Sequence, residues 1–246
     1  MRCALLGLLL AACASTADPD LEWAPAGGDC AFLRVRGERI ETAVLRTRTP
    51  SGAIVDLVGV YHVGSASYYA ALERHLADAD VVLSESKMSF VDETTRADAI
   101  DPDLKLIHRY QMAVALALDL ELQMAWERSI ADERWMPLDL PMKRMADSGP
   151  LLSAPSRARA ERVVADPRSM RDEVRTGLLE AARNPAPPSE AQRRRDQAIR
   201  DGLARVLKLQ RPRRVVLLFG PAHLRALAPA LGYQAESVVW YPVTNS

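Results

Sequence analysis

The sequence has few cysteines, few aromatic residues and no excess of charge of either sign. Of its 246 residues three are cysteines, aromatic residues make up 5%, and 32 Lys and Arg balance 32 Asp and Glu. The balanced charge gives no basic bias toward nucleic acid, so no nucleic-acid partner is expected. With 48% hydrophobic and 26% charged residues, the composition is that of a soluble globular domain with a real core.

The chain begins with an apolar segment too short to cross a membrane. Arg2 precedes the run Ala4–Ala12, whereas a transmembrane helix needs about 20 residues, so a retained membrane span is the weaker interpretation. A positive charge, an apolar run and small residues are typical of a secretory signal. The end of the run, Leu10-Ala11-Ala12-Cys13, resembles the bacterial lipobox, in which the cysteine is acylated. The alternative is a plain signal with a chance cysteine.

The lipobox resemblance sets the expected processing and location. Residues 1–12 would be a lipoprotein signal peptide, Cys13 the lipid anchor, and Ala14 would favour the outer membrane, with the protein facing the periplasm. Cys30 would then be the one thiol of the mature chain, which excludes an intramolecular disulfide and a cysteine zinc cluster. We expect a tether over residues 13–32 and a single domain over 33–246.

Apolar and β-branched runs predict the strands of that domain. Ile40–Thr47 and Ala53–Tyr61 flank Pro50-Ser51-Gly52 and predict a hairpin. Val81-Val82-Leu83 and Val215–Phe219 read as buried strands, each connected to helical patterns. Residues of about 102–209 are mostly helix formers, with no convincing buried strand, and Met112–Met124 is expected to be helical.

These elements predict an α/β fold with a mostly parallel central sheet. The fold would have an N-terminal hairpin and a large helical insertion between two halves, each made of a strand, a Gly-x-x-His turn and a helix. The turns are Gly59-Val60-Tyr61-His62 and Gly220-Pro221-Ala222-His223, and Glu85 follows another strand. Because parallel strands end at one edge, His62, Glu85 and His223 are expected to converge there.

These turns, Glu85 and Arg194-Arg195-Asp196 resemble the TraB, GumN and Tiki superfamily, which is related to the EreA and ChaN folds. The likeness runs from about Ile40 to Trp240. It implies an α/β core with a helical insertion and, in some members, a metal-dependent peptidase whose two histidines and glutamate bind the metal. ChaN-like relatives instead bind haem as envelope lipoproteins.

The chain departs from that family in one motif. Relatives often have Glu-Arg-Asn where this sequence has Arg194-Arg195-Asp196, so any role copied onto position 194 is in doubt. Asp139 in Pro137-Leu138-Asp139-Leu140 resembles a family position whose function is unclear.

The chemistry of the predicted site leaves two classes of function open. His62, His223 and Glu85 would hold a divalent metal, and nitrogen and oxygen donors suit manganese, iron, cobalt or zinc. With Glu85 and Arg195 as catalytic residues, such a site suits a hydrolase of envelope peptides or proteins. An ordinary salt bridge of Arg195, and a His62 satisfied by a backbone carbonyl, are the structural alternatives. The other class is a noncatalytic lipoprotein that binds haem or a partner protein.

Overall fold

The computed structural model of the chain describes residues 21–22, 31–85, 101–138, 152–185 and 188–244. The predicted signal peptide, Cys13 and Asp139 lie outside the described residues. The elements, in chain order, are β1 (Leu21–Glu22), β2 (Leu33–Arg36), β3 (Arg39–Arg48), β4 (Ile54–Gly59), β5 (Val63–Gly64), α1 (Ala66–Leu76), β6 (Val81–Ser84), α2 (Pro102–Leu118), β7 (Glu121–Leu122), α3 (Gln123–Ile130), β8 (Trp135–Pro137), α5 (Ala154–Ala165), α6 (Arg171–Arg183), α7 (Glu190–Gln210), β9 (Arg214–Phe219), α8 (Pro221–Leu231) and β10 (Gln234–Pro242).

One eight-stranded sheet organises the fold, with the order β1-β10-β3-β4-β9-β6-β8 and β2 paired to β3. Strands β4, β9, β6 and β8 run parallel, whereas the strands on the other side pair antiparallel. The predicted α/β class is confirmed. The predicted hairpin is also present, because β3 and β4 pair antiparallel around the turn at Pro50-Ser51-Gly52.

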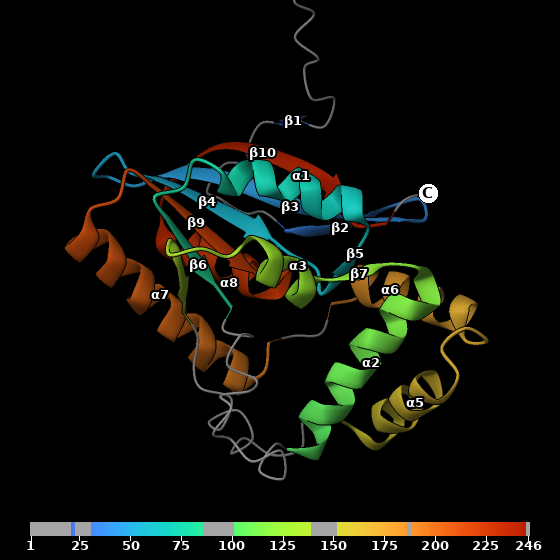
Figure 1. The fold of residues 1–246 in the computed structure, drawn as a ribbon. Coiled ribbons are helices and arrows are strands. Elements are labelled where there is room, and N and C mark those ends of the chain that lie inside the picture. Colours follow the sequence, from blue (N-terminus) through green and yellow to red (C-terminus); the bar gives the residue numbers. More distant parts are fainter. Residues whose placement is uncertain (1–20, 23–30, 86–100, 139–151, 186–187, 245–246) are drawn as a thin grey trace, which may run out of the picture.

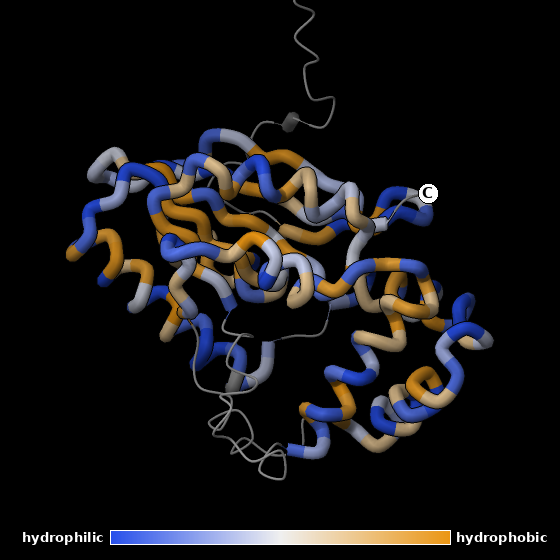
Figure 2. Tube along the Cα trace, in the orientation of Figure 1, coloured by the Kyte–Doolittle hydropathy of each residue, from blue (hydrophilic) through white to orange (hydrophobic). Residues whose placement is uncertain are grey.

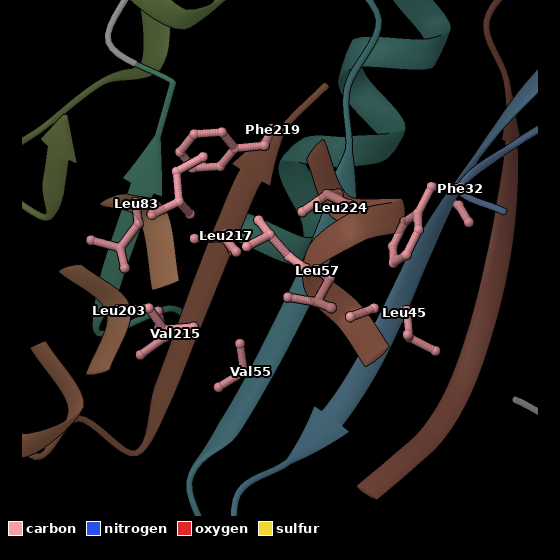
Figure 3. Close-up of a cluster of buried hydrophobic side chains, with 14 of the residues drawn as sticks. Phe32, Leu45, Val55, Leu57, Leu83, Leu203, Val215, Leu217, Phe219 and Leu224 are labelled. Carbon is pink, nitrogen blue, oxygen red and sulfur yellow. The ribbon is translucent and has the colours of Figure 1, made fainter. Parts of the chain in front are cut away.

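Side-chain alternation along the central strands gives the sheet two apolar faces. Leu57 and Leu217 lie on the face covered by α7 and α8, while Val58 and Leu218 lie on the face covered by α1 and α3. Figure 3 shows the first of these clusters, where Leu203 of α7 and Leu224 of α8 meet side chains from four neighbouring strands. Figure 2 shows hydrophobic residues concentrated in the central strands. The result is a helix–sheet–helix layering, with α8 behind the sheet and α1 in front of it in Figure 1.

The helical insertion forms a third apolar cluster beside the sheet. Val114 of α2, Val163 of α5 and Val174 of α6 are buried there together with Val63 of β5. In Figure 1 these helices lie to one side of the layered core. The insertion is therefore attached to the core through β5, which follows β4 and packs against the helices of the insertion.

Two details of the insertion differ from the sequence prediction. The predicted helix Met112–Met124 is broken, because α2 ends at Leu118 and Asp119 caps it in the left-handed conformation (φ 55°). Short polar side chains tolerate that conformation better than most. The second difference is β8, a strand inside a region predicted to be helical. It is three residues long, too short for a periodic pattern, and forms because β6 offers it an edge.

The predicted tether over residues 13–32 is joined to the domain at two described points. Leu21–Glu22 pairs with Val238–Val239 of β10, and Phe32 is fully buried in the core. The folded domain therefore includes residues before 33.

A buried ionic network lies toward the amino end of the parallel strands. Asp56 of β4 is fully buried and accepts hydrogen bonds from Arg46 of β3 (2.7 and 2.9 Å) and Arg214 of β9 (3.0 and 2.7 Å). Arg214 also donates to the backbone oxygen of His75, and the His75 ring bonds to the hydroxyl of Tyr241 at 2.7 Å. His75 of α1 is thus held against β9 and β10.

Candidate functional site

The register of the parallel strands brings three chain segments to one edge of the sheet. Gly59 of β4 pairs with Phe219 of β9, and Ser84 of β6 pairs with Leu218. Two backbone hydrogen bonds continue this alignment past the strands, from Val60 to Phe219 and from Glu85 to Leu218. Both Gly-x-x-His turns and Glu85 therefore follow strands that end at the same carboxyl edge, as predicted.

His223 is held in the first turn of α8 rather than in a loop. Gly220 caps this helix, and Pro221 occupies a first-turn position that needs no backbone donor. The Nδ1 atom of His223 lies 2.5 Å from Oδ1 of Asp196 on α7, with side-chain exposures of 8% and 9%. An ionised Asp accepts from Nδ1–H, which leaves Nε2 as the unprotonated ring nitrogen when the imidazole is neutral.

Glu85 is held by the residue next to Asp196. The Arg195 guanidinium donates to Oε1 of Glu85 at 2.6 Å, and both side chains are nearly buried. Two consecutive residues of α7 therefore hold Glu85, which follows β6, and His223, which follows β9.

Gly220 shows how close the carboxylate and the imidazole come. A Cβ atom at this position would lie 3.9 Å from Oε2 of Glu85 and 4.0 Å from Cδ2 of His223. Both side chains thus face the small space above the Gly220 backbone. A side chain at this position would contact both groups.

His62 lies at the same edge but is bound to a different helix. Its Nδ1 is 3.0 Å from Oε1 of Gln123, the first residue of α3, and the Gln123 backbone N–H donates to the His62 carbonyl at 2.9 Å. Gln123 in turn donates to Glu127 at 2.5 Å, and both residues are buried. Tyr61, the residue before His62, stays protonated near neutral pH and cannot act as a base there, because burial raises its pKa to about 12.

The predicted metal ligands are therefore brought together in part. Within the described residues, no three His, Cys, Asp or Glu side chains are grouped so as to hold a metal ion. Glu85 and His223 do converge, and the Nδ1 of both His62 and His223 is engaged by an acceptor. Metal-binding histidines usually have their second nitrogen fixed in this way. The donor chemistry fits a divalent ion, while the third ligand position is not assembled.

The remaining residues near the site either contribute to it or lie away from it. Arg194, whose family role was in doubt, is exposed and pairs with Glu190 one turn away. Asp196 and Gln123 contribute to the site, although the sequence assigned neither of them a role. Asp196 had one usable signal, its place beside Arg195 on α7, the helix before β9, whereas Gln123 had none.

No protein-family model, curated protein or solved structure matches this chain. The resemblance to the TraB, GumN and Tiki superfamily stays a prediction. Within the described part of the chain, no helix has the length and apolar character needed to span a bilayer.

Proposed function

We propose that this chain is a metal-dependent hydrolase of the bacterial cell envelope that cleaves peptide bonds at the carboxyl edge of its sheet. One observation carries the proposal: Glu85, Arg195, Asp196 and His223 form a nearly buried ionisable cluster around Gly220. Open α/β sheets usually place their sites at this edge. The lipobox-like segment before Cys13 supports the envelope location.

The energetics of burial favour a functional role for this cluster. Removing charged groups from water is costly, and apolar side chains of similar volume often stabilise a fold as well or better. Here the Arg195–Glu85 ion pair and the His223–Asp196 hydrogen bond lie side by side at a sheet edge where the neighbouring core positions are apolar. A cluster of ionisable groups with specific charge partners at this edge of a sheet is a candidate for a functional site.

The residues of the cluster have separate roles in the proposed reaction. Asp196 holds the proton on Nδ1 of His223, so that Nε2 can bind a ligand or take up a proton. Arg195 fixes the carboxylate of Glu85, and its remaining N–H groups suit a developing oxyanion. When bound by Glu85, His223 and His62, a divalent ion would lower the pKa of a water molecule and polarise a carbonyl group.

Metal content and hydrolysis test this function directly. The purified chain is reconstituted separately with manganese, cobalt and zinc, bound metal is measured by elemental analysis, and cleavage of a quenched fluorescent peptide library is followed. We expect stoichiometric metal and turnover in the wild type. Both should fall at least about tenfold in Glu85→Gln and His223→Ala, because even an outer partner of a metal ligand is worth that much.

Arg194→Ala is the matched control, since it removes an exposed arginine adjacent to Arg195. It should keep wild-type metal content and turnover. A wild type that neither binds these metals nor cleaves peptides would contradict the proposal. If the same protein instead bound haem in an absorbance titration, the noncatalytic alternative would replace the hydrolase.

A further inference from the structure

A line of buried polar groups runs from the ring of His62 into α3, and we call its three members, His62, Gln123 and Glu127, the α3 relay. The Nδ1 atom of His62 lies 3.0 Å from Oε1 of Gln123, and Nε2 of Gln123 donates to Oε1 of Glu127 at 2.5 Å. Gln123 and Glu127 lie one helical turn apart on the same face of α3 and are 1% and 2% exposed. Burying a carboxylate is costly, and apolar side chains of similar volume often stabilise a fold as well or better. Packing alone therefore does not account for Glu127.

The charge of Glu127 decides which way the amide of Gln123 faces. An ionised carboxylate only accepts hydrogen bonds, so it takes the NH2 side of the amide. The amide oxygen then faces Nδ1 of His62, and this oxygen also only accepts. The proton of the neutral ring must therefore be on Nδ1, which leaves Nε2 as the unprotonated nitrogen.

The backbone and a second anchor of α3 keep these groups in register. The Gln123 N–H donates to the carbonyl oxygen of His62 at 2.9 Å, and the residues beside them pair antiparallel as β5 and β7. Further along α3, the Trp126 ring stacks on Tyr69 of α1 with centroids 4.8 Å apart, and its Nε1 donates to Glu73 at 2.7 Å. The contact between the His62 ring and the amide is therefore held by main-chain pairing as well as by the side chains.

We infer that Glu127 is a positioning residue, which acts through Gln123 to keep the proton of His62 on Nδ1 so that Nε2 can bind a metal ion. Asp196 does the same for His223 by direct contact with its Nδ1. The two histidines at this edge of the sheet thus present the same nitrogen, and each is oriented by its own buried carboxylate. The inference rests on the proposed function for the metal, whereas the tautomer of His62 depends on neither metal nor turnover.

Nitrogen-15 NMR of the metal-free chain reads the tautomer, because a protonated and an unprotonated ring nitrogen have different chemical shifts. Spectra are recorded at about pH 8.5, where a histidine of ordinary pKa is neutral. The chain has four histidines, and the signals of His62 are assigned by their loss in His62→Ala. We expect wild-type His62 to carry its proton on Nδ1.

Glu127→Gln keeps the size of the side chain and removes its charge. The Gln123 amide can then face either way, so the Nδ1–H form of His62 should fall to about half of the population. The affinity for zinc in a calorimetric titration should fall about tenfold to a hundredfold, as for other outer partners of metal ligands. Exchanging the two residues, Gln123→Glu with Glu127→Gln, puts the carboxylate next to the ring and should restore the Nδ1–H form.

Glu73→Gln is the matched control, because it changes an acceptor on α1 that binds α3 outside the relay. It should leave the tautomer unchanged. The inference is overturned if His62 of the wild type carries its proton on Nε2, if Glu127→Gln keeps the wild-type tautomer or the wild-type affinity for zinc, or if the exchanged protein does not have the Nδ1–H form. The wild type and the exchanged protein decide the question even where Glu127→Gln does not fold.

Failure of the proposed function gives a different result. A wild type that shows the Nδ1–H form, loses it in Glu127→Gln and yet binds no zinc, manganese or cobalt would refute the metal-dependent hydrolase and leave the control of the tautomer by Glu127 intact. Metal binding and peptide cleavage by a wild type whose His62 carries its proton on Nε2 would do the opposite.

Discussion

Replacing Asp196 with asparagine keeps the size of the side chain and removes its negative charge. In the wild type the carboxylate accepts from Nδ1 of His223 at 2.5 Å and sets the tautomer of the ring. The amide that takes the place of this carboxylate has a donor side as well as an acceptor side. If the donor side faces Nδ1, the ring proton moves to Nε2, and Nε2 can no longer bind a cation or accept a proton.

The cost of this change is estimated from the burial of the pair. Both side chains are less than one-tenth exposed, so solvent screens the interaction little. Hydrogen bonds to charged groups contribute about 1.5–3 kcal/mol to stability. Since one kcal/mol shifts the Tm of a domain of this size by about 2–4 °C, Asp196→Asn should lower Tm by about 3–12 °C. Metal affinity and turnover should fall about tenfold to a hundredfold.

Thermal unfolding by circular dichroism, metal titration and peptide cleavage are measured on the same preparations of wild type and Asp196→Asn. The control is Arg194→Ala, whose exposed pair with Glu190 contributes at most about 0.5 kcal/mol. An Asp196→Asn protein with unchanged Tm and wild-type turnover would show that the carboxylate neither stabilises the fold nor orients His223. A lower Tm with unchanged turnover would assign the pair to stability alone.

Three further changes have defined outcomes. Gly220→Ala should change Tm by no more than a few degrees, because its Cβ meets nothing closer than 3.9 Å and the loss of a glycine N-cap offsets the entropic gain, yet lower turnover about tenfold or more by placing a methyl group against both the carboxylate and the imidazole. Asp56→Asn should lower the unfolding free energy from urea denaturation by about 3–5 kcal/mol, since it leaves two arginines beside a neutral group. Burial lowers the pKa of His75 below 6.5, so the unfolded chain takes up the proton more readily. Stability should therefore fall as pH drops through about 6.5, and the urea midpoint of His75→Gln should depend less on pH between about 7.5 and 5.5.

The sequence predicts well where local pattern and burial agree. The strands β3, β4, β6 and β9 were recognisable because β-branched and apolar runs ended at turn residues. The helix between β4 and β6 indicated that these two strands run parallel. Prediction from the sequence fails where a contact with a distant part of the chain determines the secondary structure. Strand β8 has no pattern of its own and exists because β6 has an edge to pair. Leu21–Glu22 likewise becomes a strand through β10.

The residues of the candidate site also differ in whether local sequence could identify them. Glycine and histidine at strand ends identified His223 and Glu85, because strand ends map to a sheet edge once the strands are known to be parallel. The partners of His62 and His223 depend on how α3 and α7 pack against opposite faces, which no local spacing encodes. Thus the pairing of His62 with Gln123, 61 positions away, was not predictable, and it directs the His62 ring toward α3.

The two ionic networks of this protein differ in a way that separates stability from function. Around Asp56 the carboxylate is fully buried and both its oxygens are bound by Arg46 and Arg214, so the network is closed. The cluster at the carboxyl edge is also nearly buried, but within the described residues Nε2 of His223 makes no hydrogen bond. A closed network leaves no atom of the carboxylate free for a ligand, whereas an unbonded ring nitrogen can accept a proton or bind a cation. Disruption of the Asp56 network should therefore appear in unfolding free energy, and disruption of the edge cluster in ligand binding and turnover.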